Sequence, residues 1–315
     1  MSLISRNYWV ITVKISIIIP TLNAQRCLPD LLDSLSSQSI DNKEIIIIDS
    51  GSVDKTTKIA LSYGAHVQSI EVGEFNHGRT RNIAAQKAKG KYLVFLTQDA
   101  LPVNDRMLEN LVTPLEKDNK IAVAYGRQIA YNDACTIEKI VRAFNYPESS
   151  ITRDKYDIEN LGVKTFFCSN ACAIYRTGVF RQYKGFRDNT IMNEDMEFVY
   201  RVVMSGYRVQ YAAGAVVWHS HDYTFFEQFK RYVDIGVFFA ENRSLAACSD
   251  NESEGVKYIK HAMGRLYQDR QCAAFADLLI DSLARFLGYN VGVRYALLPA
   301  RFMRYISMNR NYWAS

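Results

Sequence analysis

The sequence predicts an α/β protein with a mixed, mainly parallel sheet flanked by helices. Two β-branched apolar runs, residues 14–22 and 43–52, each end near a turn residue, as buried parallel strands do. Leucines at helical spacing lie between these runs, and the strand–helix alternation continues to residue 96. The 315 residues are 48% hydrophobic and 23% charged, which is the composition of an ordinary folded protein.

Each element follows from its own local pattern. Leu28, Leu31, Leu32 and Leu35 predict the first helix, and Gly64 closes the second. Later strands are short runs rich in β-branched or aromatic residues, and later helices have apolar residues three and four apart. After the first strand, the expected elements are a helix at 27–39, a strand at 43–52, a helix at 52–64, a strand at 66–72, a helix at 80–90, a strand at 92–96, a helix at 104–118 and strands at 121–130 and 209–218.

Two parts are expected, a sheet domain over residues 1–240 and a helical appendage over 241–315. From Asp281 to Ser315 the chain has five arginines against that one aspartate, set among bulky apolar residues. Several of the apolar side chains share one helical face, namely Leu279, Leu283, Phe286 and Leu287. Such a basic, aromatic segment can lie on an anionic membrane surface. Alternatively, it packs on the main domain or forms a dimer contact.

Other features exclude several classes of protein. No apolar run reaches the roughly 18 residues that a membrane span needs. Residues 7–19 are interrupted by Lys14 and lack a cleavage site, so they predict a strand and not a signal peptide. The six cysteines form no C-x-x-C pair and predict reduced thiols in a cytoplasmic protein. A net charge of +5 does not indicate a nucleic-acid partner.

Two aspartates stand at the carboxyl ends of predicted strands. Asp49 ends the second strand, and Asp99 closely follows the strand at 92–96. Ligands of open α/β sheets gather at this edge, so both carboxylates are placed to meet a ligand or a metal ion. Each also has an ordinary explanation, because an aspartate in a turn commonly accepts hydrogen bonds from the backbone.

An ordered set of motifs resembles the family 2 glycosyltransferases of the GT-A fold, which transfer sugars from nucleotide diphosphates with inversion. The resemblance covers residues 14–240, and "FNHGRTRN" looks most like bacterial rhamnosyltransferases that use dTDP-L-rhamnose to build surface polysaccharides such as O-antigen. The motifs are "IIIPTLNA", "IIIIDSGSVDKT", "FNHGRTRNIAAQKAKGKYLVFLTQDALP", "NEDMEFVYRVVMSGY" and "QFKRY".

The resemblance implies a donor site whose residues come from most of these motifs. The first two loops would hold the base and ribose, with Asp49 accepting from the pyrimidine N3–H. The arginines would contact the diphosphate, or in the case of Arg231 the acceptor; a solvated helix face is the alternative for Arg231. The implied donor-binding residues are Pro20, Thr21, Asn23, Asp49, Arg79, Arg81, Gln98, Asp99 and Arg231.

Relatives usually have an Asp-x-Asp pair where this chain has Thr97, Gln98 and Asp99. A single carboxylate can still hold Mg²⁺ or Mn²⁺ once the donor phosphates supply further ligands. The resemblance implies His219 as a second protein ligand. We expect only His219 to reach the site, because the chain should turn before His221. Basic side chains could instead carry the charge of the leaving group.

The motif "NEDMEF" supplies the candidate catalytic carboxylates. Inverting transfer is a one-step displacement that needs the acceptor hydroxyl deprotonated as it attacks. The resemblance implies Asp195 as the base and Glu194 as its support. The alternative is that both acids merely favour a helix N-terminus that Asn193 caps. The hypothesis requires Asp99 and Asp195 to converge on one nucleotide-sugar pocket.

The acceptor is the least specified part of the hypothesis. Residues 146–170 predict a polar loop that lines the acceptor side. The rhamnosyltransferase resemblance and the basic tail together imply a polyprenyl-diphosphate-linked saccharide at the inner face of the bacterial cytoplasmic membrane. Two alternatives remain open, a family 2 enzyme that uses a UDP-hexose, and a donor-binding or scaffold protein that has lost catalysis with the missing acid at position 97.

Overall fold

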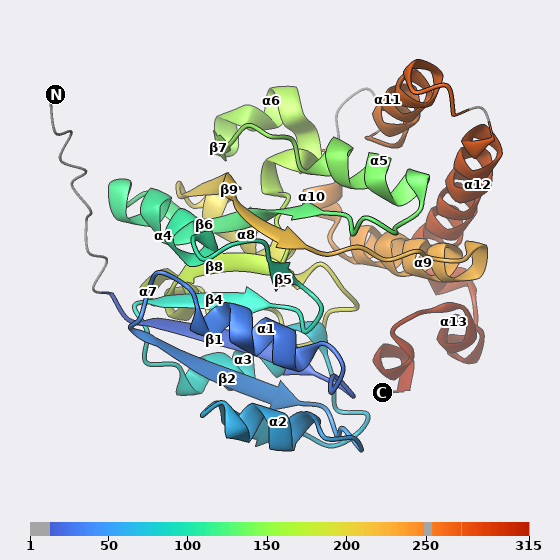
Figure 1. The fold of residues 1–315 in the computed structure, drawn as a ribbon. Coiled ribbons are helices and arrows are strands. Elements are labelled where there is room, and N and C mark those ends of the chain that lie inside the picture. Colours follow the sequence, from blue (N-terminus) through green and yellow to red (C-terminus); the bar gives the residue numbers. More distant parts are fainter. Residues whose placement is uncertain (1–12, 249–253, 272, 315) are drawn as a thin grey trace, which may run out of the picture.

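The computed structural model describes residues 13–248, 254–271 and 273–314 of the chain. Its main feature is a nine-stranded sheet in the order β3-β2-β1-β4-β8-β6-β9-β5, with β7 paired to β9 (Figure 1). The strands are β1 (Ile15–Thr21), β2 (Lys43–Asp49), β3 (His66–Ser69), β4 (Tyr92–Leu96), β5 (Leu101–Pro102), β6 (Ile121–Ile129), β7 (Ile151–Arg153), β8 (Cys172–Arg176) and β9 (Arg208–Trp218).

The sheet is mainly parallel, as expected. β1 pairs in parallel with β2 and β4, β2 with β3, and β6 with β9, whereas β8 runs antiparallel to both β4 and β6. The register pairs Leu96 with Cys172, so the start of β8 lies beside the end of β4. The carboxyl ends of the parallel strands and the start of β8 therefore share one edge.

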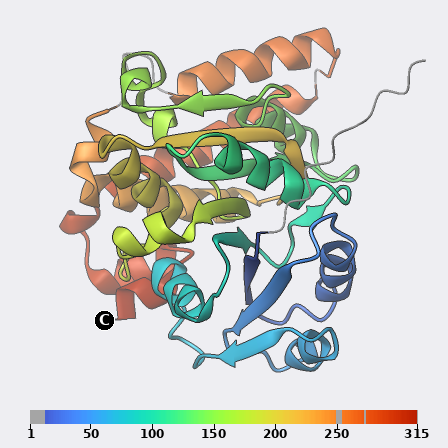
Figure 2. The same cartoon turned by 90° about the vertical axis from the view of Figure 1, so that its left-hand side faces the viewer.

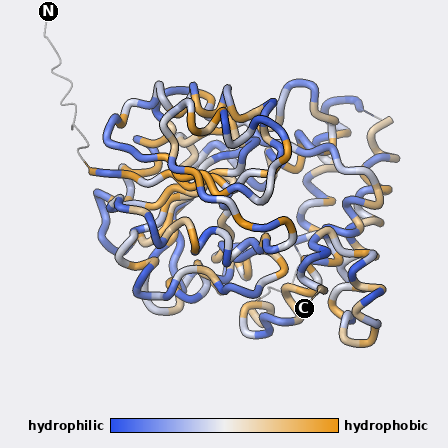
Figure 3. Tube along the Cα trace, turned by 90° about the horizontal axis from the view of Figure 1, so that it is seen from below, coloured by the Kyte–Doolittle hydropathy of each residue, from blue (hydrophilic) through white to orange (hydrophobic). Residues whose placement is uncertain are grey.

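Helices cover both faces of the sheet (Figure 1, Figure 2). Ile15, Ile17 and Ile19 of β1 pack with one set of helices and Ile18 with the other, because successive strand residues point to opposite faces. One set is α1 (Leu28–Ser36), α2 (Thr56–Ser62) and α4 (Met107–Lys117); the other includes α3 (His77–Lys87), α7 (Thr177–Gln182) and α8 (Glu194–Met204). Apolar segments concentrate along the strands in the middle of the sheet domain (Figure 3).

The expected helical appendage follows the sheet. Helix α9 (Phe225–Glu241) ends the predicted sheet domain, and the helices of the appendage are α10 (Arg243–Ala246), α11 (Glu254–Gln268), α12 (Ala274–Val293) and α13 (Ala300–Ile306). Glycines let α9 and α12 approach closely, since a Cβ at Gly292 would lie 2.1 Å from the Val233 carbonyl oxygen. None of the helices among the described residues has the length and hydrophobicity that a membrane span requires.

The structure corrects some local expectations. Residues 146–170 do not form a simple loop: they contain β7, the short helix α6 (Ile158–Leu161) and single turns of 3-10 helix. β8, which our sequence analysis did not anticipate, interrupts the parallel pattern. Helix α5 (Thr136–Asn145) was likewise unexpected. Five cysteines are free, as predicted, while Cys272 and the part of the N-terminal prediction that concerns residues 7–12 lie outside the described residues.

Candidate active site

Asp49 and Thr21 end adjacent strands in register at the ligand-binding edge. The Asp49 carboxylate is buried and accepts from the hydroxyls of Thr21 and Ser52, at 2.9 and 2.5 Å. It also accepts from the backbone N–H groups of Gly51 and Ser52, in a turn where Gly51 has φ +84°. Asp49 therefore shapes its own loop, and its contact with a base stays a prediction.

The first loop is fixed by two side-chain amides. The Asn23 Oδ1 accepts from the Val53 N–H at 3.0 Å and so joins the first loop to the second. The Gln98 side chain pairs with the backbone of Leu22, accepting from its N–H at 2.8 Å and donating to its carbonyl at 3.3 Å. Pro20, the last but one residue of β1, leads into this loop. The loops predicted to hold the donor thus form one connected wall.

Asp99 lies beside two histidines. Its carboxylate is 3.5 Å from His219 Nε2 and 3.4 Å from His221 Nε2, and the two Nε2 atoms are 3.1 Å apart. The expectation that only His219 would reach this place is therefore wrong, because the rings of both histidines lie beside the Asp99 carboxylate. The three residues form a cluster able to hold a divalent cation.

Gln128 sets the tautomer of His219. Arg142 can only donate, and it donates to Gln128 Oε1, so this oxygen also accepts from His219 Nδ1 at 2.8 Å. His219 then carries a proton on Nδ1 and turns Nε2 toward Asp99. Metal-binding histidines are oriented in this way by an acceptor on the other ring nitrogen.

The protonation states also suit cation binding. Burial and the neighbouring His219 lower the pKa of His221 to about 4. At neutral pH the His221 ring is therefore neutral and carries a proton on only one of its two nitrogens. Burial opposes ionisation of Asp99, but the hydrogen bond and charge of His219 outweigh it and hold the pKa of this carboxyl well below its usual range. The cluster therefore offers an ionised carboxylate and, at His221, a neutral imidazole.

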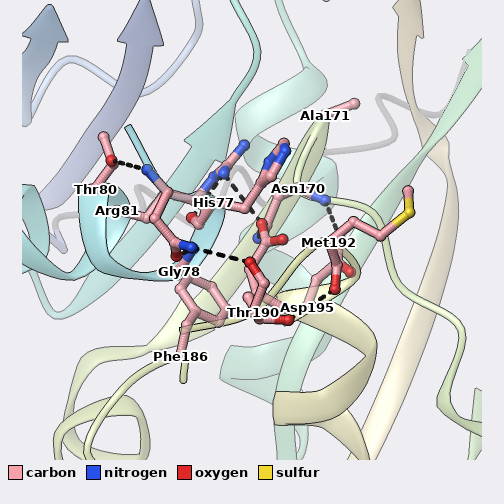
Figure 4. A network of polar contacts seen from close by, with 12 residues as sticks. His77, Gly78, Thr80, Arg81, Asn170, Ala171, Phe186, Thr190, Met192 and Asp195 are labelled. Carbon is pink, nitrogen blue, oxygen red and sulfur yellow. Dashed lines mark hydrogen bonds and ion pairs between the residues drawn. The ribbon is translucent and has the colours of Figure 1, made fainter. Parts of the chain in front are cut away.

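Glu194 and Asp195 begin α8, and Figure 4 shows Asp195 beside Asn170. Glu194 Oε1 is 3.1 Å from Arg81 Nη1 and accepts from Asn170 Nδ2 at 2.8 Å. Asp195 Oδ2 accepts from the backbone N–H of Asn170 at 2.8 Å. Asn193 makes no capping contact through its side chain, so the cap on which the alternative explanation of the two acids relied is absent. Asn170 thus holds both acids.

The two carboxylates differ in acidity. Burial and the charge of Glu194 raise the pKa of Asp195. Burial also disfavours ionisation of Glu194, yet the charge of Arg81 and the hydrogen bond from Asn170 lower its pKa overall. Glu194 is therefore the ionised member and Asp195 the member that exchanges a proton, which is the arrangement of an acid–base site.

A continuous polar network joins the two clusters. His219 contacts Gln128, and Gln128 Nε2 is 2.8 Å from the hydroxyl of Ser169. The next residue, Asn170, donates to Asp195. The structure thus brings Asp99 and Asp195 to one edge of the sheet, linked through His219, Gln128 and the backbone of residues 169–170. That one donor molecule occupies the space between them stays a prediction.

The three predicted arginines occupy different environments. Arg81 is buried, donates to the His77 carbonyl at 2.9 Å, and has no acceptor for its Nε among the described residues. Arg79 is exposed and donates to the Glu74 carbonyl, away from the carboxylate pair. Arg231 lies over the ring of Tyr223, and its charge contributes, after burial, to the lowered pKa values of His77 and His221. It therefore lies near both clusters.

Our sequence analysis missed several site residues. Gln128 follows the strand-end rule and could have been found at the end of β6. Asn170 precedes the unexpected strand β8, so no recognised pattern marked it. His77 was noted only for the shape of its loop; the adjacent Gly78 is needed because a Cβ there would lie 1.9 Å from the Arg187 carbonyl oxygen.

Taken together, a mainly parallel sheet, a paired-acid site and a neighbouring cation-type cluster at its ligand edge define a GT-A-type transferase. The chain belongs to glycosyl transferase family 2. The sequence model of this family matches residues 16–184, which is over half of the chain. It is accordingly a glycosyltransferase, and the predictions of family, fold and enzyme class are confirmed.

Relatives match almost the whole chain. It is 40% identical over 306 residues to the O-antigen chain rhamnosyltransferase RfbN of Salmonella typhimurium, covering 96% of each protein. It is 38% identical to the O-antigen chain rhamnosyltransferase WbaN of Salmonella anatum, covering 95% of each. A similar solved structure is the mannosyltransferase PcManGT of Pyrobaculum calidifontis with GDP-Man and Mn²⁺, with a TM-score of 0.56, 17% identity and coverage of 96% and 85%. That likeness concerns the fold.

Proposed function

We propose that the protein is an inverting rhamnosyltransferase that moves L-rhamnose from dTDP-L-rhamnose onto a saccharide acceptor in O-antigen assembly. The observation that carries this proposal is the similarity, along nearly the entire chain, to two O-antigen chain rhamnosyltransferases. The paired acids and the Asp99 cluster support catalysis over an inert scaffold, because both keep the protonation states that transfer needs.

In the proposed reaction Asp195 is the general base. Its carboxylate takes the proton of the acceptor hydroxyl as the hydroxyl oxygen bonds to the anomeric carbon of the sugar. The bond from that carbon to the phosphate oxygen breaks at the same time, and dTDP leaves with the electron pair. Glu194 stays ionised beside Arg81 and raises the proton affinity of Asp195, so the base is matched to neutral pH.

The leaving diphosphate requires positive charge at the opposite end of the site. Asp99, His219 and His221 would hold a divalent cation, and their mixed oxygen and nitrogen donors favour Mn²⁺ over Mg²⁺. The bound ion would neutralise the charge that develops on the diphosphate. Arg81 would add its unpaired Nε–H, and Arg231 its guanidinium. Pro20, Thr21, Asn23, Asp49 and Gln98 would form the wall for the nucleoside.

A donor panel tests the assignment. The full chain is incubated with Mn²⁺, a lipid-linked saccharide acceptor and either dTDP-L-rhamnose or a UDP-hexose, and release of dTDP or UDP is measured. Acceptor-dependent release from dTDP-L-rhamnose supports the proposal. Faster release from a UDP-hexose favours the alternative donor, and no release from any donor favours the donor-binding scaffold.

We also propose that the enzyme works peripherally at the cytoplasmic face of the membrane, where a polyprenyl-diphosphate-linked acceptor would lie. The outer face of α12 carries exposed apolar side chains, with Leu279 71% and Phe286 65% accessible. Exposed arginines follow at positions 294, 301 and 304, and no acidic residue occurs after Asp281. An apolar surface bordered by cations suits anionic lipid better than a second copy with the same positive charge.

A further inference from the structure

The last described segment of the chain returns from the appendage to the sheet domain. Residues 307–309, here termed the C-terminal strap, follow α13 and are anchored on Asp234, a fully buried residue of α9. Asp234 Oδ2 accepts from the backbone N–H groups of Met308 and Asn309, each at 3.1 Å. It also accepts from Asn309 Nδ2 at 3.1 Å. The strap is therefore fixed at one carboxylate oxygen.

The anchoring determines what Asn309 offers to the active site. Because its Nδ2 donates to Asp234, its Oδ1 faces the other way and lies 3.0 Å from His77 Nε2. An amide oxygen can only accept, so His77 carries a proton on Nε2. Burial lowers the pKa of His77, so the ring is neutral with its lone pair on Nδ1. The strap thus selects one tautomer of a residue 232 positions away.

His77 is in turn part of the acid–base cluster. Its carbonyl accepts from Arg81, and Arg81 pairs with Glu194. The charged groups that act on the His77 ring come from three helices: Arg81 of α3, Glu194 of α8 and Arg231 of α9. A protonated His77 would add a second cation beside Glu194 and weaken the effect of Glu194 on Asp195. A neutral, held ring keeps that effect intact.

We propose that the C-terminal strap is a positioning element of the active site, in which Asn309 holds His77 as the neutral Nε2–H tautomer and so keeps Arg81 and Glu194 in place beside Asp195. Asn309 and His77 are positioning residues and touch no substrate in this mechanism. The inference rests on the proposed function for its catalytic consequence, while the contact between strap and ring can be tested without substrate.

The test compares Asn309→Ala, His77→Ala and the double variant with the full wild-type chain. Loss of one hydrogen bond between neutral groups predicts a kcat about three- to tenfold lower for Asn309→Ala, with the donor KM nearly unchanged. The double variant should be no slower than His77→Ala, because both changes remove the contact between Asn309 and the His77 ring, and it is this contact that affects the active site. Asn311→Ala, at an exposed position just after the strap, is the matched control and should retain wild-type kcat.

Nitrogen NMR of the histidine rings supplies a readout that a merely structural role would not move. The wild type should show His77 as the neutral Nε2–H tautomer at pH 7, and Asn309→Ala should show a mixture of tautomers. A folded Asn309→Ala protein with unchanged ring signals, or with unchanged kcat, would overturn the proposal. Absence of turnover with every donor contradicts the proposed function instead, and the ring signals still decide whether the strap holds His77.

Discussion

Asp99 and Asp195 are the same side chain in two neighbouring environments, and the protein gives them opposite properties. Two imidazoles face Asp99 and keep it ionised, against the effect of burial. Asp195 has a carboxylate as its neighbour, so burial and like charge together raise its pKa. The neighbours of each acid, and not its residue type, thus assign one to a cation and the other to a proton.

The largest effect should come from removing the base. Asp195→Asn keeps the size of the side chain and its contact with Asn170 but cannot take a proton. General base catalysis contributes about a hundred- to ten-thousandfold, so kcat should fall by that order. Nucleotide release under saturating donor measures it. The control is Asp105→Asn, at an exposed site away from the edge. Full turnover by Asp195→Asn would show that another group is the base.

A smaller loss is expected at the other acid. Asp99→Asn removes the only carboxylate of the cation cluster, so Mn²⁺ affinity and turnover should each fall, on the order of a hundredfold for turnover. A titration in which free Mn²⁺ is detected by its electron paramagnetic resonance spectrum measures the affinity directly. Gln128→Ala should also weaken Mn²⁺ binding, by about tenfold or more, since it releases the His219 ring. Equal Mn²⁺ affinity in Asp99→Asn and the wild type would show that Asp99 does not hold the cation.

These two acids differ in how far the sequence predicts them. Asp99 and His219 follow the ends of β4 and β9, which run in the same direction although β8 and β6 lie between them, so the strand-end pattern places both at one edge. His221 could not be placed, because it depends on whether the chain turns after β9. The alternation of strands and helices through residue 130 was also predicted, because each element has its own local pattern of apolar residues.

The surroundings of Asp195 depend on long-range contacts that no local pattern encodes. Asn170 reaches the acids because β8 runs antiparallel between β4 and β6, and the motif around it gave no strand signal. His77 is held by Asn309 from the far end of the chain. The family resemblance supplied Asp195 and Glu194 themselves, but their pairing with Arg81 and the split of their pKa values required the folded arrangement.

The pH dependence of turnover sharpens the comparison further. The active form of Asp195 is the carboxylate, and its pKa is raised, so kcat should rise with pH through a limb above the usual carboxyl range. Glu194→Gln removes the neighbouring negative charge. The pKa of Asp195 should then fall, and the limb should move to lower pH by about one unit. At a fixed pH on the rising part of the limb, kcat should therefore be about tenfold higher than in the wild type. If the limb does not move in a folded Glu194→Gln protein, the limb does not arise from the titration of Asp195.

The smallest effect on turnover is expected from substitutions on the exposed face of α12. This face lies outside the sites of Asp99 and Asp195, so its variants can be compared with variants of both acids. The double variant Leu279→Gln and Phe286→Gln should leave turnover of a water-soluble acceptor unchanged. Each apolar side chain contributes about 1.5–3 kcal/mol when fully buried, so binding to phosphatidylglycerol vesicles should fall by tenfold or more in a flotation assay.

Two comparisons make this last experiment decisive. Leu61→Gln, on the exposed side of α2, removes a similar apolar side chain from the sheet domain and should float with the vesicles as the wild type does. Vesicles of phosphatidylcholine should bind weakly, because the arginines of the appendage need anionic headgroups. Equal flotation of all variants would contradict the membrane assignment. If the α12 variant instead changes only the mass measured by gel filtration, the face joins two copies of the chain, and the acceptor must reach Asp195 without help from the lipid surface.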